Sequence, residues 1–460
     1  MNGTNRTSRK KQSKQHRRSN RSNSQQATNG QLSKKQQAIL NAPVKFGDEV
    51  LVTIHGIGSS GEGVGRVDDF TVFVPFALPG ETVKVAIDMV KKTYATGKLL
   101  DIVTMAPNRI DPNCDLYGFC GGCQLQHITY EGQLSLKTQK VKDVIERIGH
   151  QNPDLVKPTL GPKEPWAYRN KMQMPVGGTK GDIQMGFYAM GSHDIVQGTN
   201  CPIQDEGNNI IAQACYQIAK EFDIEPYDEH TGKGVLRHII GRIGQSGWMI
   251  ILVTATDYLP HQEKWVVKLT ERIPQVETIV HNVNGKRTNV ILGPKNNILY
   301  GDGTITDHIK DLQFTLSPHS FFQVNPEQTT VLYDQALEYA DLKGDETVID
   351  AYCGTGTISL FLAHKAKHVI GIEIVEPAII NARENAQRNG YDNIEFIVAD
   401  AAVEMPKLYK AGVRPDVIVF DPIRAGCKEE VLTSAAGMEP KRIVYVSCNP
   451  ATMARDIEIL

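Results

Sequence analysis

Cys448 is the residue of this sequence best placed to act as a nucleophile. It follows the apolar run 443–446, which predicts a strand, and the proline two residues later predicts the start of a helix. A cysteine at the end of a strand and beside a helix N-terminus can be activated as a thiolate and presented to a substrate. Two further cysteines near predicted strand ends are lesser candidates, Cys353 and Cys427.

Acidic residues end three predicted strands that follow the turn 350–357, and they mark a candidate cofactor pocket. They are Glu373, Asp400 and Asp421. The two glycines of the turn let the backbone approach a ligand closely, although Gly-x-Gly alone is a weak signal. Three carboxylates at one edge repel phosphates, so S-adenosylmethionine, with its cationic sulfur, fits better than NAD or ATP. Asp400 could instead be a helix cap.

A thiol close to a sulfonium methyl donor predicts methylation of a pyrimidine at C5. C5 is a poor nucleophile until another group adds to C6. A thiolate that adds at C6 makes C5 enolate-like, so that C5 can attack the methyl group. A base must then remove the C5 proton before the cysteine can leave.

Three thiols in the loop Cys114-x5-Cys120-x2-Cys123, with Cys201 as a remote fourth, predict a metal centre. Four thiolates can hold zinc or an iron–sulfur cluster. A structural zinc site usually shows two short Cys-x-x-Cys knuckles, so the uneven spacing favours an iron–sulfur cluster. The five-residue gap does not match the radical-enzyme pattern, and the remaining alternative is a group of unrelated free thiols.

The elements that must position these residues fall into three regions. Short β-rich runs in residues 43–104 predict a small OB-like barrel of a kind that often binds single-stranded nucleic acid. Residues 105–325 predict the cysteine loop and a central α+β domain. From 326 to 460 strands and helices alternate, which predicts a Rossmann-like parallel α/β sheet with ligands at the carboxyl ends of its strands.

The predicted elements can be stated as residue ranges. In the barrel we expect strands at 50–54, 70–74, 83–87 and 99–103, with basic and aromatic groups at one loop from Lys91, Lys92 and Tyr94. In the central domain we expect a helix at 130–148 and paired strands at 235–243 and 248–254. After a helix at 328–340, we expect strands at 347–351, 368–373, 394–398, 416–420 and 442–447.

The 460-residue chain carries a formal charge of only −2, but its charge is unevenly distributed. Residues 1–41 contain ten Lys or Arg and no Asp or Glu, so the remaining 40 basic and 52 acidic side chains give −12. The tail 1–42 is therefore predicted to be disordered, serving either as a contact for a polyanion such as RNA or as a solubilising segment. The sequence has no apolar run for a membrane span or secretory signal, which predicts a cytoplasmic protein.

From about residue 44 onward the sequence resembles the RNA uracil-5-methyltransferases, most closely the 23S rRNA (uracil-5-)-methyltransferases that carry a TRAM domain and an iron–sulfur cluster. The motifs that carry this resemblance are Gly63-Val64-Gly65-Arg66, Cys120-Gly121-Gly122-Cys123-Gln124-Leu125-Gln126-His127, Tyr168-Arg169-Asn170-Lys171, Phe321-Phe322-Gln323-Val324-Asn325, Asp421-Pro422-x-Arg424-Ala425-Gly426 and Ser447-Cys448-Asn449-Pro450.

The resemblance implies a role for each matching residue. The barrel and the central domain would bind RNA, and Cys448 would be the nucleophile. A 4Fe-4S cluster would be held by Cys114, Cys120, Cys123 and Cys201. S-adenosylmethionine would contact Gln323, Tyr352, Thr357, Glu373, Asp400 and Asp421.

The sequence departs from the family pattern at two points. Ile423 stands where the family motif Asp-Pro-Pro-Arg has its second proline, which could loosen that loop. No residue of 1–460 matches the family glutamate that removes the C5 proton, so we expect this base beyond Leu460 and the methyltransferase domain to be C-terminally incomplete. Two alternatives remain open: a tRNA uracil-C5 methyltransferase, whose family members usually lack the barrel and the cysteine cluster, and a catalytically impaired RNA-binding or assembly factor. The resemblance implies no protein partner.

Overall fold

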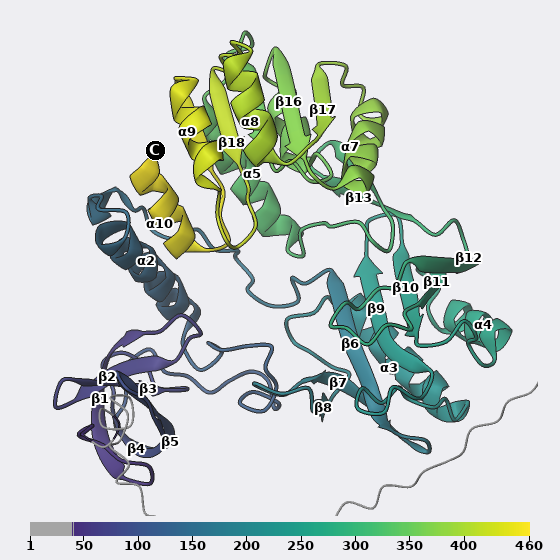
Figure 1. The fold of residues 1–460 in the computed structure, drawn as a ribbon. Coiled ribbons are helices and arrows are strands. Elements are labelled where there is room, and N and C mark those ends of the chain that lie inside the picture. The colour runs from purple at the N-terminus through teal and green to yellow at the C-terminus, as the bar shows by residue number, and fades with distance from the viewer. Residues whose placement is uncertain (1–38, 40) are drawn as a thin grey trace, which may run out of the picture.

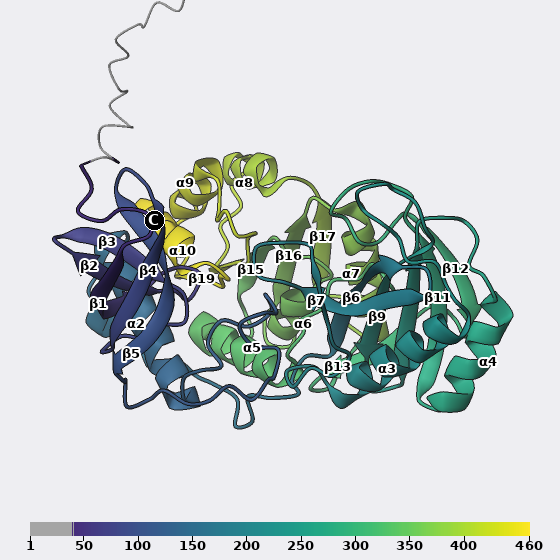
Figure 2. The ribbon, with the colours of Figure 1, turned by 90° about the horizontal axis from the view of Figure 1, so that it is seen from below.

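A computed structural model describes residue 39 and residues 41–460. The basic tail expected for residues 1–42 lies almost entirely outside the described residues, so its properties stay predictions. The described chain forms an N-terminal barrel, a central domain with a large sheet, and a C-terminal domain with a parallel sheet. Figures 1 and 2 show the barrel and the central sheet at the two ends of the molecule, with the C-terminal domain between and above them in Figure 1.

The barrel is closed by strands in the order β1-β2-β3-β5-β4. Alternate side chains such as Val52, Ile54 and Val72 point inward and are fully buried, as expected for strands with one face on a core. Gly65 is required where β1 and β2 meet, because a Cβ there would lie 2.3 Å from Val52 Cγ1. The strand bounds are β1 Glu49–Ile57, β2 Gly63–Val67, β3 Phe70–Val74, β4 Thr82–Val90 and β5 Tyr94–Thr104.

Glu81 joins the barrel to the segment that leads into the cysteine loop. Its carboxylate is fully buried and accepts hydrogen bonds from Arg109 Nε at 2.6 Å and Arg109 Nη2 at 2.8 Å. The backbone N–H groups of Leu78 and Ala106 donate to the same carboxylate. Burial raises the pKa of Glu81, but these donors outweigh it and leave the pKa below its usual value.

Helix α2 (Tyr130–Arg147) follows the cysteine loop and is capped by Thr129, whose side chain accepts from the N–H of Gly132. It packs against the last helix of the chain, α10 (Pro450–Ile459), and both views show the two side by side. Gly149, just after α2, permits the approach, because a Cβ there would lie 3.2 Å from the backbone oxygen of Ala454.

The central domain is built on a seven-stranded sheet in the order β12-β11-β10-β9-β6-β7-β8. Helices α3 (Glu206–Glu221) and α4 (Gln262–Arg272) cover one face, and the buried Met172, Trp265 and Ile211 belong to that core. Neither helix was predicted from the sequence. The strands are β6 Lys171–Thr179, β7 Asp182–Tyr188, β8 Ile195–Gln197, β9 Leu236–Ile243, β10 Trp248–Thr254, β11 Val276–Val283 and β12 Lys295–Tyr300, and a short 3-10 helix lies at Pro153–Leu155.

The other face of this sheet shares a hydrophobic core with the C-terminal domain. Ile240, Met249 and Val280 from the sheet belong to the same buried cluster as Tyr333 and Val348. A hairpin between the two domains contributes to this core as well, and its strands are β13 Ile305–Ile309 and β14 Leu312–Leu316.

The C-terminal domain has a five-stranded parallel sheet in the order β17-β16-β15-β18-β19, which confirms the predicted Rossmann-like fold. Side chains on α6 and α7 pack on one face, and side chains on α8 and α9 pack on the other. The elements are α5 Pro326–Ala340, β15 Thr347–Ala351, α6 Thr357–Ala363, β16 His368–Glu373, α7 Glu376–Arg388, β17 Ile394–Val398, α8 Ala401–Lys410, β18 Val417–Phe420, α9 Glu429–Gly437 and β19 Arg442–Tyr445.

Glu81→Ala should destabilise the protein by about 3–5 kcal/mol, because it leaves a half-buried guanidinium and two N–H groups without their acceptor. Urea unfolding at pH 7 measures this loss. The wild type should lose the same stabilisation as the pH falls below 4.5, the ordinary pKa of the group, because a lowered pKa stabilises only the ionised form. The control is Glu49→Ala, which removes an exposed partner of Lys84 on the same barrel and should change little; equal effects from both variants would contradict the assignment.

Candidate functional site

The candidate cofactor pocket lies where the carboxyl ends of β15, β16 and β18 meet. β15 pairs in parallel with β16 on one side and with β18 on the other, so Tyr352, Glu373 and Asp421 follow neighbouring strands. The Glu373 carboxylate accepts hydrogen bonds from the N–H of Gly354 at 3.2 Å and of Val375 at 2.9 Å. These bonds hold the glycine turn against the end of β16, and Glu373 itself is partly exposed.

The turn after β15 has an unusual backbone. Tyr352 has φ +74°, a left-handed conformation that costs energy for a residue with a side chain. Gly354 and Gly356 also have positive φ, and Gly356 stands directly before α6. A Cβ at Gly354 would meet no atom within 4 Å, so glycine is needed here for the conformation of the turn.

Tyr333 of α5 connects two of the predicted cofactor residues. Its hydroxyl lies 3.1 Å from Thr357 Oγ1 and is hydrogen-bonded to the side chain of Gln323. Burial raises the pKa of Tyr333 to about 12, so the phenol stays neutral and can both donate and accept. The loop with Gln323 is in turn anchored to the central domain, because Asn170 N donates to Val324 O at 3.0 Å and Asn170 Nδ2 donates to Gln323 O. Tyr333 was not among the predicted site residues.

Two acids give this edge a negative field. Burial raises the pKa of Asp421 to about 6, so it is ionised at pH 7. Asp350 lies fully buried at the end of β15, where burial and the neighbouring Asp421 and Glu373 raise its pKa to about 7. Ser359 donates to one oxygen of Asp350, while the other has no partner among the described residues. The cluster suits a cationic ligand and disfavours phosphates.

Asp400 is placed differently from the other acids. It is the N-cap of α8, where one carboxylate oxygen accepts from the N–H of Ala402 at 2.9 Å, and the other pairs with Lys428 Nζ at 2.9 Å. Without cofactor, Asp400 therefore acts as a helix cap, which is the alternative that the sequence left open.

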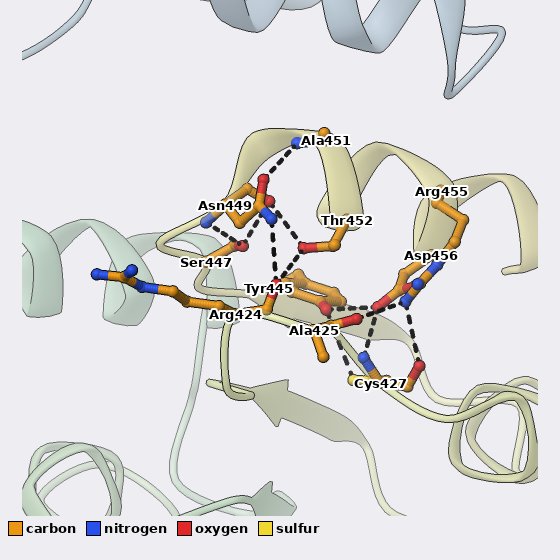
Figure 3. Close-up of polar contacts among 10 residues, drawn as sticks. All are labelled: Arg424, Ala425, Cys427, Tyr445, Ser447, Asn449, Ala451, Thr452, Arg455 and Asp456. Carbon is orange, nitrogen blue, oxygen red and sulfur yellow. Dashed lines mark hydrogen bonds and ion pairs between the residues drawn. The ribbon is translucent and has the colours of Figure 1, made fainter. Parts of the chain in front are cut away.

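Cys448 lies exposed on the loop between β19 and α10, beside the same edge of the sheet. The loop is fixed by its neighbours. Ser447 Oγ bonds both the N–H and the carbonyl oxygen of Asn449, and Asn449 Oδ1 accepts from Ala451 N to cap α10. Figure 3 shows that Asn449 and Thr452 also reach across to the carbonyl oxygen of Arg424, in the segment that follows Asp421. Ile423 in that segment is 76% exposed and lies at the surface.

Asp456 of α10 makes a second link between the same parts of the chain (Figure 3). It is fully buried, and its Oδ2 accepts hydrogen bonds from Cys427 N at 2.7 Å and Tyr445 OH at 2.6 Å. Arg455 pairs with the other carboxylate oxygen. One carboxylate thus ties the helix behind Cys448 to the end of β19 and to the loop after β18. Asp456 was not predicted from the sequence. Its position was nevertheless a signal, because it is an acid at the helical spacing of the apolar residues 453, 457 and 460.

The four predicted metal ligands come together. Cys114, Cys120, Cys123 and Cys201 line one cavity of about 240 Å³, together with Arg169 and Gln126 among others. All eight cysteines are free thiols, and burial raises the pKa of Cys120, Cys123 and Cys201. Within residues 41–460 no group of three or more His, Cys, Asp or Glu side chains is arranged to hold a metal ion.

A second cavity, of about 510 Å³, lies between the barrel and the cysteine loop. Its aromatic lining comes from Phe73, Phe76 and Tyr94, and Glu62 adds a carboxylate. Phe73 and Tyr94 pack edge to face with ring centroids 5.4 Å apart. Tyr94 belongs to the loop expected to carry basic and aromatic groups, and Lys91 and Lys92 in that loop are exposed.

Two family descriptions match the chain. The TRAM domain matches residues 43–100, and a methyltransferase domain matches residues 342–458. An uncharacterized RNA methyltransferase of Halalkalibacterium halodurans is 49% identical over 431 residues, which cover 93% of each chain. One of Clostridium tetani is 49% identical over 420 residues, 91% of each chain.

A solved structure agrees in fold. The tRNA (uracil-54, C5)-methyltransferase of Pyrococcus abyssi, in complex with S-adenosyl-L-homocysteine, is 26% identical and has a TM-score of 0.72, covering 89% of this chain and 93% of its own.

Among the described residues of our chain, no helix has the length and apolar character to cross a membrane.

These matches confirm the predicted resemblance, the TRAM barrel, the methyltransferase fold and the use of S-adenosylmethionine. The chain belongs to the family of RNA methyltransferases, in which a TRAM barrel precedes an S-adenosylmethionine-dependent methyltransferase domain.

Proposed function

We propose that this enzyme methylates uridine at C5 in RNA, with 23S rRNA as its substrate and Cys448 as its covalent nucleophile. The observation that carries the proposal is the position of an exposed thiol beside the acidic cofactor edge of the same parallel sheet. The likeness to a tRNA (uracil-54, C5)-methyltransferase supports the same chemistry and makes tRNA the second candidate substrate.

The proposed reaction uses the thiol to activate a carbon. The Cys448 thiolate adds to C6 of uracil, and the electron pair displaced from the C5–C6 double bond makes C5 nucleophilic. C5 then takes the methyl group from the sulfonium, which leaves as neutral S-adenosylhomocysteine. Removal of the C5 proton by a base restores the double bond and expels the thiolate.

The proposed cofactor contacts are those implied by the resemblance. Glu373 would bind the ribose hydroxyls, and Asp421 would face the cationic end of the cofactor. The remaining proposed contacts are Gln323, Tyr352, Thr357 and Asp400. Since both oxygens of Asp400 are already engaged, we expect it to contribute less than Glu373. Tyr333 would position Gln323 and Thr357 through its hydroxyl.

We also propose that the cysteine cavity holds a 4Fe-4S cluster. Four thiols line one cavity, and their uneven spacing in the sequence, with one five-residue gap and one remote cysteine, is what favours a cluster over a structural zinc ion. The positive charge of Arg169 would offset the negative charge of a thiolate-bound cluster. When bound, the cluster would supply a cross-link between the loop 114–123 and Cys201.

A single-turnover methylation assay tests the function. Excess enzyme with labelled S-adenosylmethionine should methylate an unmodified 23S rRNA transcript, and the label should map to C5 of uridine. This readout reports methyl transfer itself and does not require the later loss of the C5 proton. Label on a tRNA transcript alone would select the second substrate, and label on neither RNA would contradict the enzyme proposal for uridine.

Cys448→Ala should lower that single-turnover rate by at least about a thousandfold, because no other group can activate C5. RNA affinity measured by filter binding should stay close to that of the wild type. The control is Cys215→Ala, which removes a buried thiol from α3 far from the site and should keep the wild-type rate. A Cys448→Ala enzyme that still transfers methyl groups would exclude this residue as the nucleophile.

Asp456→Asn should lower the methyl-transfer rate by about tenfold or more, because the amide NH2 must face donors on either side, the Cys427 N–H or the Arg455 guanidinium. Covalent trapping on an RNA with 5-fluorouridine should fall with the rate, while the dissociation constants of RNA and cofactor change little. Glu458→Gln, an exposed neighbour on α10, is the control. An unchanged trapping rate below the melting temperature would reduce Asp456 to a purely structural residue.

The affinity for S-adenosylmethionine should fall as the pH drops from 7 to 5, with a midpoint about 6. Burial raises the pKa of Asp421 to about 6, so acid neutralises the carboxylate that attracts the sulfonium. Calorimetric titration should show a weaker pH dependence for Asp421→Asn, in which Asp350 still titrates, and a wild-type profile for the exposed control Glu395→Gln. The affinity for S-adenosylhomocysteine, which is neutral at sulfur, should depend less on pH. An equal pH dependence of the two affinities would contradict this electrostatic role of Asp421.

A further inference from the structure

Two cations lie directly opposite each other in the central sheet. Lys171 of β6 pairs with Arg242 of β9 in an antiparallel register. Like charges in this position are destabilising, so the arrangement needs a reason. Both strands lie in the half of the central sheet seen below the C-terminal domain in Figure 1.

The pair faces the C-terminal domain. Side chains alternate along a strand, and Met172 belongs to the core under α3, so Lys171 points to the opposite face. On β9, Gly241 faces Asn208 of α3, whereas Ile240 belongs to the core shared with the C-terminal domain. Arg242 therefore lies on the same inner face as Lys171.

The charges acting on Lys171 are all positive. It is half-buried, and burial together with the charges of Arg242 and Arg169 lowers its pKa to about 7. No ion pair joins its ammonium to a carboxylate in the described part of the chain. His319 approaches from the adjoining loop, and the pKa of His319 is also lowered, first by burial and then by Lys171 and Arg242.

Arg242 does not relieve this excess of charge. It is 3% exposed and donates to the carbonyl oxygen of Ser320, while its Nε has no partner among the described residues. Asp307 is the one acid whose charge acts on it, and burial raises the pKa of Asp307, which weakens the compensation. Among the described residues, the half-buried ammonium of Lys171 thus has no ion-pair partner and the buried Nε of Arg242 has no hydrogen-bond acceptor, which fits a site for an anion.

The position of the pair connects it to the candidate active site. Asn170, directly before Lys171, holds the loop of Val324 and Gln323 by two hydrogen bonds. His319 and Ser320 open the same loop. The cations therefore lie beside the segment that we assign to the cofactor, on the face of the central sheet that packs against the C-terminal domain.

We propose that Lys171, backed by Arg242, binds a phosphate of the substrate RNA next to the target uridine. The proposal rests on the proposed function and names the contact that would hold the RNA backbone there. A phosphate supplies the missing counter-charge, and a lysine gives it a point contact without reading the base. The carboxylate of the cofactor is the other anion that could enter, and the experiment separates the two.

The test compares the full chain with its Lys171→Met variant, using an unmodified 23S rRNA transcript and a tRNA transcript. Filter binding over a series of KCl concentrations gives the slope of log K against log salt. Loss of one phosphate contact should reduce the slope by about 0.9 and weaken binding by roughly tenfold or more. The dissociation constant of S-adenosylmethionine should not change.

The melting temperature of the same variant gives an independent test. Removing an uncompensated half-buried cation should leave the melting temperature equal or higher, whereas a lysine kept for folding would lower it. The control Lys295→Met removes an exposed, ion-paired lysine from the far edge of the same sheet and should leave the RNA slope unchanged. The proposal would be overturned by an unchanged salt slope for Lys171→Met. It would also be overturned if the variant bound S-adenosylmethionine more weakly but RNA normally. If the wild type binds neither RNA, the proposed function itself fails.

Discussion

The buried contact between the central sheet and the C-terminal domain is the constraint on which the site depends. One face of β9, β10 and β11 shares its core with α5 and the parallel sheet, so the two domains cannot separate without exposing that core to water. The loop with Gln323 runs along this contact and is bonded to Asn170 on one side and to Tyr333 on the other. The geometry of the cofactor pocket is thus set by domain packing as well as by the Rossmann-like fold.

Acidic and basic side chains gather on two different surfaces of the molecule. Carboxylates gather at the carboxyl ends of β15, β16 and β18, where we propose that the cationic cofactor binds, and Lys171 and Arg242 lie on the inner face of the central sheet. A polyanion would be repelled by the first surface and attracted by the second. In the proposed reaction, this separation would keep a cationic methyl donor and an RNA backbone on different surfaces of one enzyme.

Local pattern made much of the fold predictable, and long-range contacts account for most of what was missed. The parallel strands are apolar runs that alternate with helices, and their predicted bounds agree with the structure to within two residues. β2 was missed because Gly63 and Gly65 hide its strand character, and α3 because its apolar spacing lies in a region rich in strands. The contact of Asp456 with Cys427 and the pairing of Lys171 with Arg242 could not be found in this way, since these residues lie 29 and 71 positions apart in the chain.

The contact between α2 and α10 connects the surroundings of Cys448 to the barrel end of the molecule. α10 begins two residues after Cys448, carries Asp456 in its interior, and packs against α2 close to Gly149. α2 begins directly after the cysteine loop, and the segment before that loop is bonded to the barrel through Arg109 and Glu81. The barrel, this segment and helices α2 and α10 therefore form a continuous series of contacts, and unfolding of the barrel should be cooperative with loss of order around the thiol.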